Sequence, residues 1–383
     1  MQRREFLITS AALAGSALSD RALGGADRRP QAAGERAIER AIPGGRGRFP
    51  PNNKIVELMQ VPAGLHDLNW LKQSLQAAID VELSALPPYL CAMWSIVTQR
   101  GPAYDLIHSV AIEEMLHLGL VCNLLTAIGG TPQIVQGYQE RIAYPGPLPG
   151  GVRPELTVYL AGLTQDYLKN VFMEIEYPEN GPVALALGQM YPTIGAFYGA
   201  ILEAFQALSL ELTTKNQLTS PPPIGLYLIA TPDDVETAIT QIKEQGEGTS
   251  ESPLAEHFGG DFAHYYKFAE IFHGSALIQL NGTWQYAGDP IPFPDVYPMA
   301  PIPTGGYQNP PDPAAEALRA FNDQFAIMLT KLESAWANGS MSDLGISVGA
   351  MFRLRSLARN LMQIPLPDKS GVYGPDFRPS PTS

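Results

Sequence analysis

Ile112-Glu113-Glu114-Met115-Leu116-His117 is the stretch that decides how this chain of 383 residues folds. Glu114 and His117 are three residues apart, so on an α-helix, at about 100° per residue, their side chains lie within about 60° of each other. A buried carboxylate is costly unless its charge is compensated. Glu-x-x-His is a motif with which four-helix bundles build dinuclear metal sites. The same helical stripe is otherwise apolar, which predicts that both groups point into a core: Val110, Val121, Leu125 and Ile128.

A second helical stretch, residues 65–97, contributes another inward-facing acid. Glu82 lies at the centre of its apolar stripe. Pro87 and Pro88 follow one turn later, and they predict a kinked helix with freed backbone carbonyls near Glu82.

A stretch from about residue 256 to residue 274 offers two motifs of the same form. Asp261-x-x-His264 lies on the more apolar face, so we predict that these two side chains are ligands. Glu270-x-x-His273 is nine residues further on and falls on the opposite face, which predicts a solvated or rim pair.

A four-helix site needs one more carboxylate, on the third helix. Two candidates remain open: Glu203, which is flanked by alanines within residues 192–215, and Glu176, at the end of a short helix over 164–176. Glu113 points about 100° away from Glu114 and is expected beside the site or at the surface. The predicted metal ligands are therefore Glu82, Glu114, His117, Asp261 and His264, with Glu176 or Glu203 completing the site.

Oxygen and nitrogen ligands without thiolate favour iron or manganese, in a dinuclear or mononuclear site; zinc and copper fit on affinity alone. Cys91 and Cys122 lie in apolar helical stretches and are predicted to be buried free thiols.

Charge and hydropathy restrict the partners. The first fifty residues carry nine Arg and five acidic residues, a net charge of +4. Because the net charge of the whole chain is −13, residues 51–383 carry a net charge of −17. A surface this acidic argues against nucleic acid as a partner. No uninterrupted apolar run reaches the roughly 18–20 residues of a membrane span. A small-molecule substrate is expected, and an oligomer is compatible with the sequence.

The N-terminus is typical of an export signal. Arg3-Arg4-Glu5-Phe6-Leu7 is a twin-arginine pattern followed by a mildly apolar stretch, which predicts a periplasmic or extracellular protein. We expect a signal peptide at 1–26, a disordered linker at 27–60, a metal-binding bundle at 61–280, a Pro-rich loop at 281–312 and a helical extension at 313–383.

The motifs together resemble a known family, the ferritin-like enzymes related to iminophenyl-pyruvate dimer synthase, which act in the assembly of violacein- and rebeccamycin-type pigments. The resemblance covers most of residues 65–378 and rests on several segments: Glu82-Leu83 with Pro87-Pro88-Tyr89-Leu90, Ile112 to His117, Ile128-Gly129-Gly130-Thr131-Pro132, Ile175-Glu176-Tyr177-Pro178, His264-Tyr265-Tyr266-Lys267-Phe268 and Gly374-Pro375-Asp376-Phe377. In two places the chain departs from that family. Ala196 stands where the family has Glu, and Asp261 stands where it usually has a longer carboxylate.

The resemblance implies an all-α, ferritin-like four-helix bundle that carries long Pro-rich insertions and a C-terminal helical pair. It also implies a metal-dependent oxidoreductase that uses dioxygen or peroxide, with oxidative coupling of imino acids from an aromatic amino acid as the reaction. Tyr89, Tyr198 and Tyr265 are expected near the site, where they line the substrate pocket, carry radicals or serve in packing alone. Two alternatives stay open: a ferroxidase or metal-storage protein, and a metal-free helical scaffold, which Ala196 supports.

Overall fold

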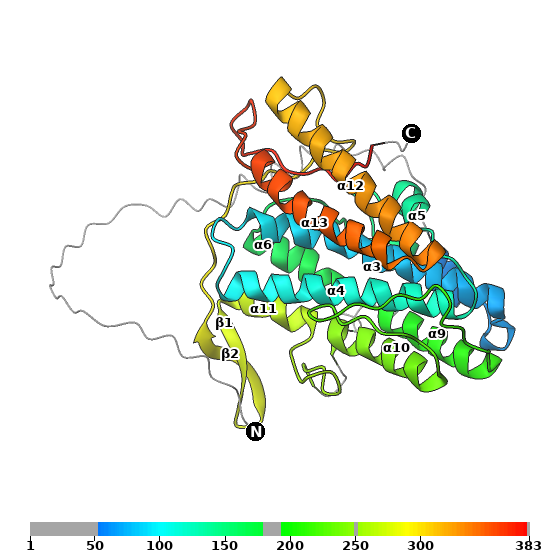
Figure 1. The fold of residues 1–383 in the computed structure, drawn as a ribbon. Coiled ribbons are helices and arrows are strands. Elements are labelled where there is room, and N and C mark those ends of the chain that lie inside the picture. The colour runs from blue at the N-terminus through cyan, green and yellow to red at the C-terminus, as the bar shows by residue number, and fades with distance from the viewer. Residues whose placement is uncertain (1–52, 179–192, 249–251, 381–383) are drawn as a thin grey trace.

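The computed structural model describes residues 53–178, 193–248 and 252–380 and is predominantly helical (Figure 1). The predicted all-α, ferritin-like class is confirmed. Within the described part of the chain the longer helices are α3 (Leu68–Ser95), α4 (Pro102–Ala127), α9 (Ile194–Leu208), α10 (Pro232–Glu247), α11 (His264–His273), α12 (Asp312–Asn338) and α13 (Met341–Leu361). Shorter helical segments are α2 (Lys54–Met59), η1 (Ala63–Leu65), α5 (Ile134–Arg141), η2 (Pro149–Gly151), α6 (Gln165–Tyr167), the π-helical turn η3 (Leu168–Phe172) and α7 (Met173–Ile175).

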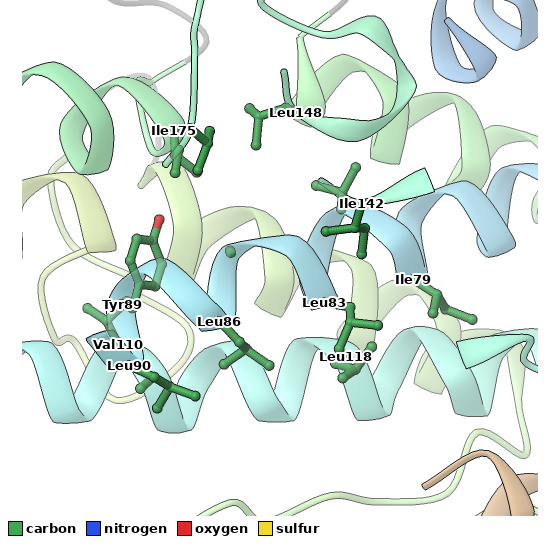
Figure 2. Packing of buried hydrophobic residues seen from close by; sticks show 14 of the residues in the cluster. Ile79, Leu83, Leu86, Tyr89, Leu90, Val110, Leu118, Ile142, Leu148 and Ile175 are labelled. Carbon is green, nitrogen blue, oxygen red and sulfur yellow. The ribbon is translucent and has the colours of Figure 1, made fainter. Parts of the chain in front are cut away.

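The centre of the molecule is the antiparallel pair α3 and α4, which are joined by a short loop. α3 packs also against α9, and α4 packs against α10 and α11. Both central helices are buried along most of their length, because their apolar residues cover more than one face. Their contact is made by large aliphatic side chains such as Leu83, Leu86 and Leu118 (Figure 2).

The two prolines of α3 leave the helix continuous from Leu68 to Ser95. Pro88 has no N–H for the carbonyl of Ser84, four residues earlier. The hydroxyl of Tyr144 donates a hydrogen bond to that carbonyl over 2.6 Å. A phenol from another segment therefore replaces the missing backbone donor one turn beyond Glu82, and the prediction of a freed carbonyl in this region is confirmed.

A β-hairpin spans the predicted boundary between the bundle and the Pro-rich loop. Strand β1 (Ser275–Leu280) pairs antiparallel with β2 (Thr283–Pro290). Asn281 and Gly282 form the turn with φ angles of 51° and 78°, and Asn-Gly is the pair that two-residue hairpin turns favour. The boundary at residue 281 therefore cuts through a hairpin, and the Pro-rich connection begins after residue 290.

The C-terminal helices α12 and α13 pack tightly against each other and cover one side of the bundle (Figure 1). Asn123 of α4 connects them to the core. Its side-chain oxygen accepts hydrogen bonds from Trp336 Nε1 at 2.9 Å and Leu218 N at 3.0 Å, and its Nδ2 donates to the carbonyls of Leu218 and Tyr227. Each hydrogen-bonding group of this fully buried amide is satisfied.

The N-terminal predictions lie largely outside the described residues, which begin at Asn53; this holds for the twin-arginine signal and for most of the linker. The last part of the predicted linker is helical. Ile55 and Leu58 of α2 are buried in the core, because α2 packs on α3 and η2.

One described helix, α4, is long and apolar enough to cross a membrane, although the sequence was expected to offer none. In its most apolar window, 83% of the residues are buried inside the protein. Core helices of soluble proteins meet the same criterion, so packing accounts for this composition.

Candidate metal centre

Five of the predicted ligands converge in the middle of the bundle. α3 supplies Glu82, α4 supplies Glu114 and His117, the end of α7 supplies Glu176, and the first residue of α11 is His264. All five are buried, with at most 7% of any of them exposed. One potential ligand atom from each of Glu114, His117 and His264 lies within 4.8 Å of the other two.

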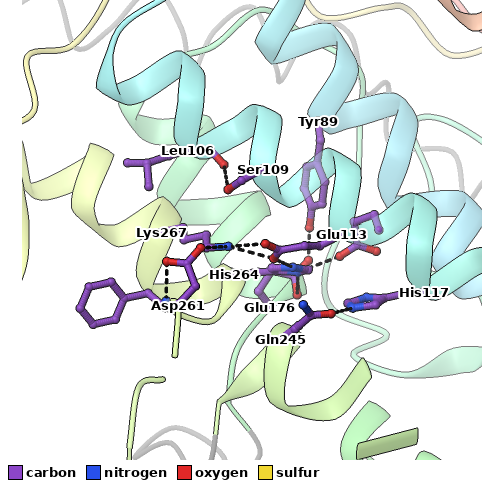
Figure 3. A network of polar contacts seen from close by, with 12 residues as sticks. Tyr89, Leu106, Ser109, Glu113, His117, Glu176, Gln245, Asp261, His264 and Lys267 are labelled. Atoms are coloured by element: carbon purple, nitrogen blue, oxygen red, sulfur yellow. Dashed lines mark hydrogen bonds and ion pairs between the residues drawn. The ribbon is translucent and has the colours of Figure 1, made fainter. Parts of the chain in front are cut away.

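His264 occupies the centre of the acids. Its Nδ1 lies 2.8 Å from Glu114 Oε1 and 3.6 Å from Glu176 Oε2. The same nitrogen has no hydrogen bond of acceptable geometry, although it is buried. On the outer side of the ring, Nε2 donates to Glu113 Oε2 over 2.9 Å (Figure 3).

His117 repeats this arrangement on the other side. Its Nδ1 lies 3.8 Å from Glu82 Oε2, and its Nε2 donates to Gln245 Oε1 of α10 over 3.0 Å. The two imidazole rings lie 5.4 Å apart between centroids and are inclined by 25°. Both rings therefore turn the same nitrogen toward the acids.

The outer contacts determine which nitrogen is available to a metal. Carboxylate and amide oxygens only accept, so the contacts to Glu113 and Gln245 place a proton on each Nε2. In the neutral ring this leaves a lone pair on Nδ1, directed at the centre. Metal-binding histidines in proteins are held in this manner.

Two phenols hold the acids in place. Tyr89 donates a short hydrogen bond to Glu176 Oε1, and Tyr198 donates one to Glu82 Oε1. Tyr198 lies on α9, the helix on which the sequence predicted a further carboxylate. α9 thus contributes a neutral donor, and Glu176 brings the number of buried carboxylates to three.

Burial and mutual interactions shift the pKa values of the clustered groups. Burial, reinforced by the charge of Glu114, raises the pKa of Glu82 well above its usual range. Burial and the charge of Glu176 also raise the pKa of Glu114. Burial opposes a charge on His264, but the neighbouring carboxylates of Glu113, Glu114 and Glu176 outweigh it and raise its pKa well above its usual range.

The pKa of His117 moves in the opposite direction. Burial, followed by the nearby charge of His264, lowers it to about 3. His117 is therefore neutral at physiological pH, which is the form that binds a metal.

A lysine lies in the core beside the cluster. Lys267 is only 1% exposed. Its Nζ lies 2.7 and 2.8 Å from the two oxygens of Glu113 and 3.0 Å from Asp261 Oδ2. Burial alone would raise the pKa of Glu113, but the hydrogen bond from His264 and the charge of Lys267 lower it to about 2.

Lys267 neutralises Glu113 and not the central acids. Across the described ranges, no lysine or arginine forms an ion pair with Glu82, Glu114 or Glu176. Three buried carboxylates and two imidazole Nδ1 atoms that face them fit a divalent cation, because such an ion supplies positive charge that no lysine or arginine supplies there.

Asp261 does not lie in the cluster. α11 begins only at His264, after Gly259 and Gly260 with φ angles of 92° and 68°, so Asp261 belongs to the preceding loop. Its carboxylate is 64% exposed and pairs with Lys267. The predicted ligand pair on this helix is therefore wrong for Asp261, while His264 is placed as predicted.

Glu203 also lies elsewhere, on the exposed side of α9. It is five residues from Tyr198, which rotates it by about 140° around the helix. Glu270 corrects the prediction of a solvated pair, because it is only 4% exposed and accepts a hydrogen bond from Leu277 N at the start of β1. His273 is exposed, as expected, and stacks on Tyr286.

Sequence reasoning missed Gln245 completely and left the position of Glu113 open. A glutamine in an amphipathic helix carries no signal of its own, so its contact with His117 follows only from how α10 packs on α4. Tyr265, in contrast, is half-buried and packs edge-on against Tyr177, away from the acids.

A cavity of about 50 Å³ lies beside the cluster, lined by Glu82, Glu114, His117, Glu176 and Tyr198 among others. A cavity needs a volume of roughly 10–15 Å³ to hold one water molecule. The cavity has room for a few waters or a dioxygen molecule next to the ligands.

These features define a helical bundle with a buried Glu/His cluster, and comparisons with known proteins support the bundle. A family model described as Ferritin-like matches residues 75–273, and the chain belongs to that family. Among solved structures, a ferritin-like protein from Caulobacter vibrioides is similar, with 23% sequence identity and a TM-score of 0.55. The match covers 80% of this chain and 97% of the Caulobacter chain, and it supports the fold alone. No curated protein matches the chain.

Proposed function

We propose that the cluster of Glu82, Glu114, His117, Glu176 and His264 binds iron, with manganese as the alternative, and that the protein is a metal-dependent oxidoreductase. The observation that carries this proposal is the pair of Nδ1 atoms directed at three carboxylates that have no lysine or arginine partner among the described residues. Carboxylate and imidazole ligands suit these metals. Five protein ligands can fill most of the coordination positions of one ion. Alternatively, they can hold two ions that keep coordination positions open for other molecules.

A bound iron supplies the redox chemistry with dioxygen, and the protein residues set the conditions for it. Glu113 and Gln245 orient the two imidazoles, and Tyr89 and Tyr198 restrain two of the acids. Burial of all five ligands excludes bulk water. The cavity beside them has room for dioxygen next to the ligands.

The proposed substrate is a small organic molecule, and the family resemblance suggests imino acids of an aromatic amino acid. Joining two such molecules through a new bond removes two hydrogens, which dioxygen accepts to give hydrogen peroxide. Ferrous iron itself is a second candidate substrate. The size of the cavity favours ferrous iron as the substrate, because a volume of about 50 Å³ holds dioxygen but not an aromatic molecule.

Oxygen consumption separates these candidates. Full-length protein is loaded with ferrous iron in the absence of oxygen, freed of excess iron and then exposed to oxygen. One arm adds an aromatic 2-oxo acid with ammonium, which forms the imino acid without consuming oxygen, and the other adds more ferrous iron.

Catalytic oxygen consumption and a coupled product in the first arm support the organic substrate. Consumption in proportion to added iron alone supports the ferroxidase. If neither arm exceeds the His264→Ala variant, the proposed oxidoreductase is wrong.

A further inference from the structure

A second, larger cavity lies on the other side of the central helices. It has a volume of about 370 Å³ and is lined by α3, α4, α13 and the loop 219–224. Pockets for small organic molecules range from roughly 300 to 1,000 Å³. Leu90 and Met115 line it, whereas their chain neighbours Tyr89 and Glu114 face the metal cluster. The two cavities are therefore separated by the α3–α4 layer.

The lining of this second cavity is apolar and deformable. Four of the eleven methionines of the chain lie in it: Met93, Met115, Met341 and Met351. Methionine side chains are unbranched and adapt to irregular apolar shapes. Such a lining suits a flexible hydrocarbon chain better than a rigid ring system.

One end of the cavity is basic, although the chain as a whole is acidic. Arg355 of α13 and His108 of α4 line the cavity and are both exposed, and no Asp or Glu is among its described lining residues. Within the described part of the chain, Arg355 forms no ion pair or side-chain hydrogen bond. A guanidinium in this position is available to a carboxylate.

The volume argues against a docked protein helix. A helix about 10 Å wide with a pitch of 5.4 Å occupies roughly 400 Å³ per turn, so the cavity holds less than one turn. α13 leaves the space open, since a Cβ added at Gly345, which lines the cavity, would meet no heavy atom within 4 Å.

We propose that this cavity binds a single-chain fatty carboxylate, with its hydrocarbon chain among the methionines and its carboxylate at Arg355. The site is independent of the metal cluster, and its ligand is recognised by burial of the chain and by one charge contact.

Calorimetric titration of the full-length protein with decanoate and with decanol tests the proposal. Gly345→Phe fills the cavity, and Gly349→Phe is its matched control, since Gly349 lies on the same helix, has equally open space and does not line the cavity. Arg355→Glu removes the basic end, and Arg353→Glu, an exposed residue outside the lining, makes the same change in charge.

We expect one decanoate per chain. Gly345→Phe should weaken binding of both probes at least about tenfold, and Arg355→Glu should weaken decanoate by a similar factor while leaving decanol within about twofold. Both control variants should bind like the wild type.

Three results would overturn the proposal. They are the absence of decanoate binding to the wild type, equal effects of the cavity and control variants, and a ligand-free dimer in sedimentation analysis that Gly345→Phe dissociates. The last result would assign the cavity to a second copy of the chain.

Discussion

At the scale of single residues, the candidate centre depends on which nitrogen of each histidine faces inward. His264 and His117 are both held by an oxygen at Nε2, at 2.9 and 3.0 Å respectively. The oxygen on His264 belongs to Glu113, whose own position is fixed by the buried Lys267. Glu113 and Lys267 are therefore positioning residues for His264 and, through it, for the proposed metal.

Glu113→Gln tests this role. The amide of the glutamine can still contact His264 but loses the ion pair with Lys267, so metal affinity should fall about tenfold to a hundredfold, as is usual for such outer contacts. Competition with a fluorescent chelator measures the affinity. Glu203→Gln is the control, since Glu203 is exposed on α9, and it should bind metal like the wild type. An unchanged affinity in Glu113→Gln would remove Glu113 from the centre.

The Asp261-x-x-His264 motif gives a second test at this scale. His264→Ala should reduce the metal content, because His264 Nδ1 points at the acids. Asp261→Asn should leave it nearly unchanged, because Asp261 is 64% exposed and lies in the loop before α11. Elemental analysis measures the metal content per chain of both variants and of the wild type. If Asp261→Asn lost as much metal as His264→Ala, the predicted pair of ligands Asp261 and His264 would be supported after all.

At the scale of elements, the sequence predicted the site residues of the long helices correctly and those of a short helix only in part. α3 and α4 have 28 and 26 residues, so their apolar periodicity placed Glu82, Glu114 and His117 correctly. α11 has ten residues, and Gly259-Gly260 ends the regular pattern in front of it. The sequence did carry that signal, and it also carried the Asn281-Gly282 turn of the hairpin.

The remaining ligand and contacts depend on tertiary packing. Glu176 follows a π-helical turn at Leu168–Phe172, a rare feature that often marks functional sites and has no dependable sequence pattern. Gln245 and Tyr198 reach the cluster because α10 and α9 pack on α4 and α3. Periodicity within one helix cannot predict contacts between helices.

Asn123 offers a prediction about how the elements are joined. Asn123→Ala leaves the hydrogen-bonding groups of Trp336, Leu218 and Tyr227 without their buried partner. Since each such group costs about 1–3 kcal/mol, the free energy of unfolding should fall by about 3 kcal/mol or more. Urea denaturation measures the change. Asn360→Ala, at an exposed position of α13, should stay within about 0.5 kcal/mol, and equal effects would show that the Asn123 network contributes little.

At the scale of the whole molecule, the bundle encloses three acids that have no lysine or arginine partner in the described part of the chain. The buried acids lie on three segments that are distant in sequence, so a cation that binds all of them stabilises only the folded chain. The scaffold alternative, in which no metal binds, leaves this electrostatic cost without a counterpart. Ala196 supported that alternative, but Glu176 supplies a third carboxylate to the site.

Metal removal should therefore lower the thermal stability. Protein stripped with a chelator should melt at a lower temperature than the same protein after ferrous iron or manganese is restored. At a free metal concentration about a thousand times the dissociation constant, the expected stabilisation is about 4 kcal/mol. Differential scanning calorimetry compares the two forms. The shift should vanish in a Glu82→Ala, Glu114→Ala double variant, and a shift that persists there would place the stabilising metal elsewhere.

The most direct measurement is the elemental analysis of the full-length protein, purified from medium supplemented with iron and manganese, beside two single variants. The wild type should contain one or two equivalents of metal per chain, His117→Ala should lose most of it, and His273→Ala should match the wild type because His273 lies outside the cluster. Wild-type protein without metal, or a His117→Ala variant that retains the full amount, would contradict the assignment of a metal centre.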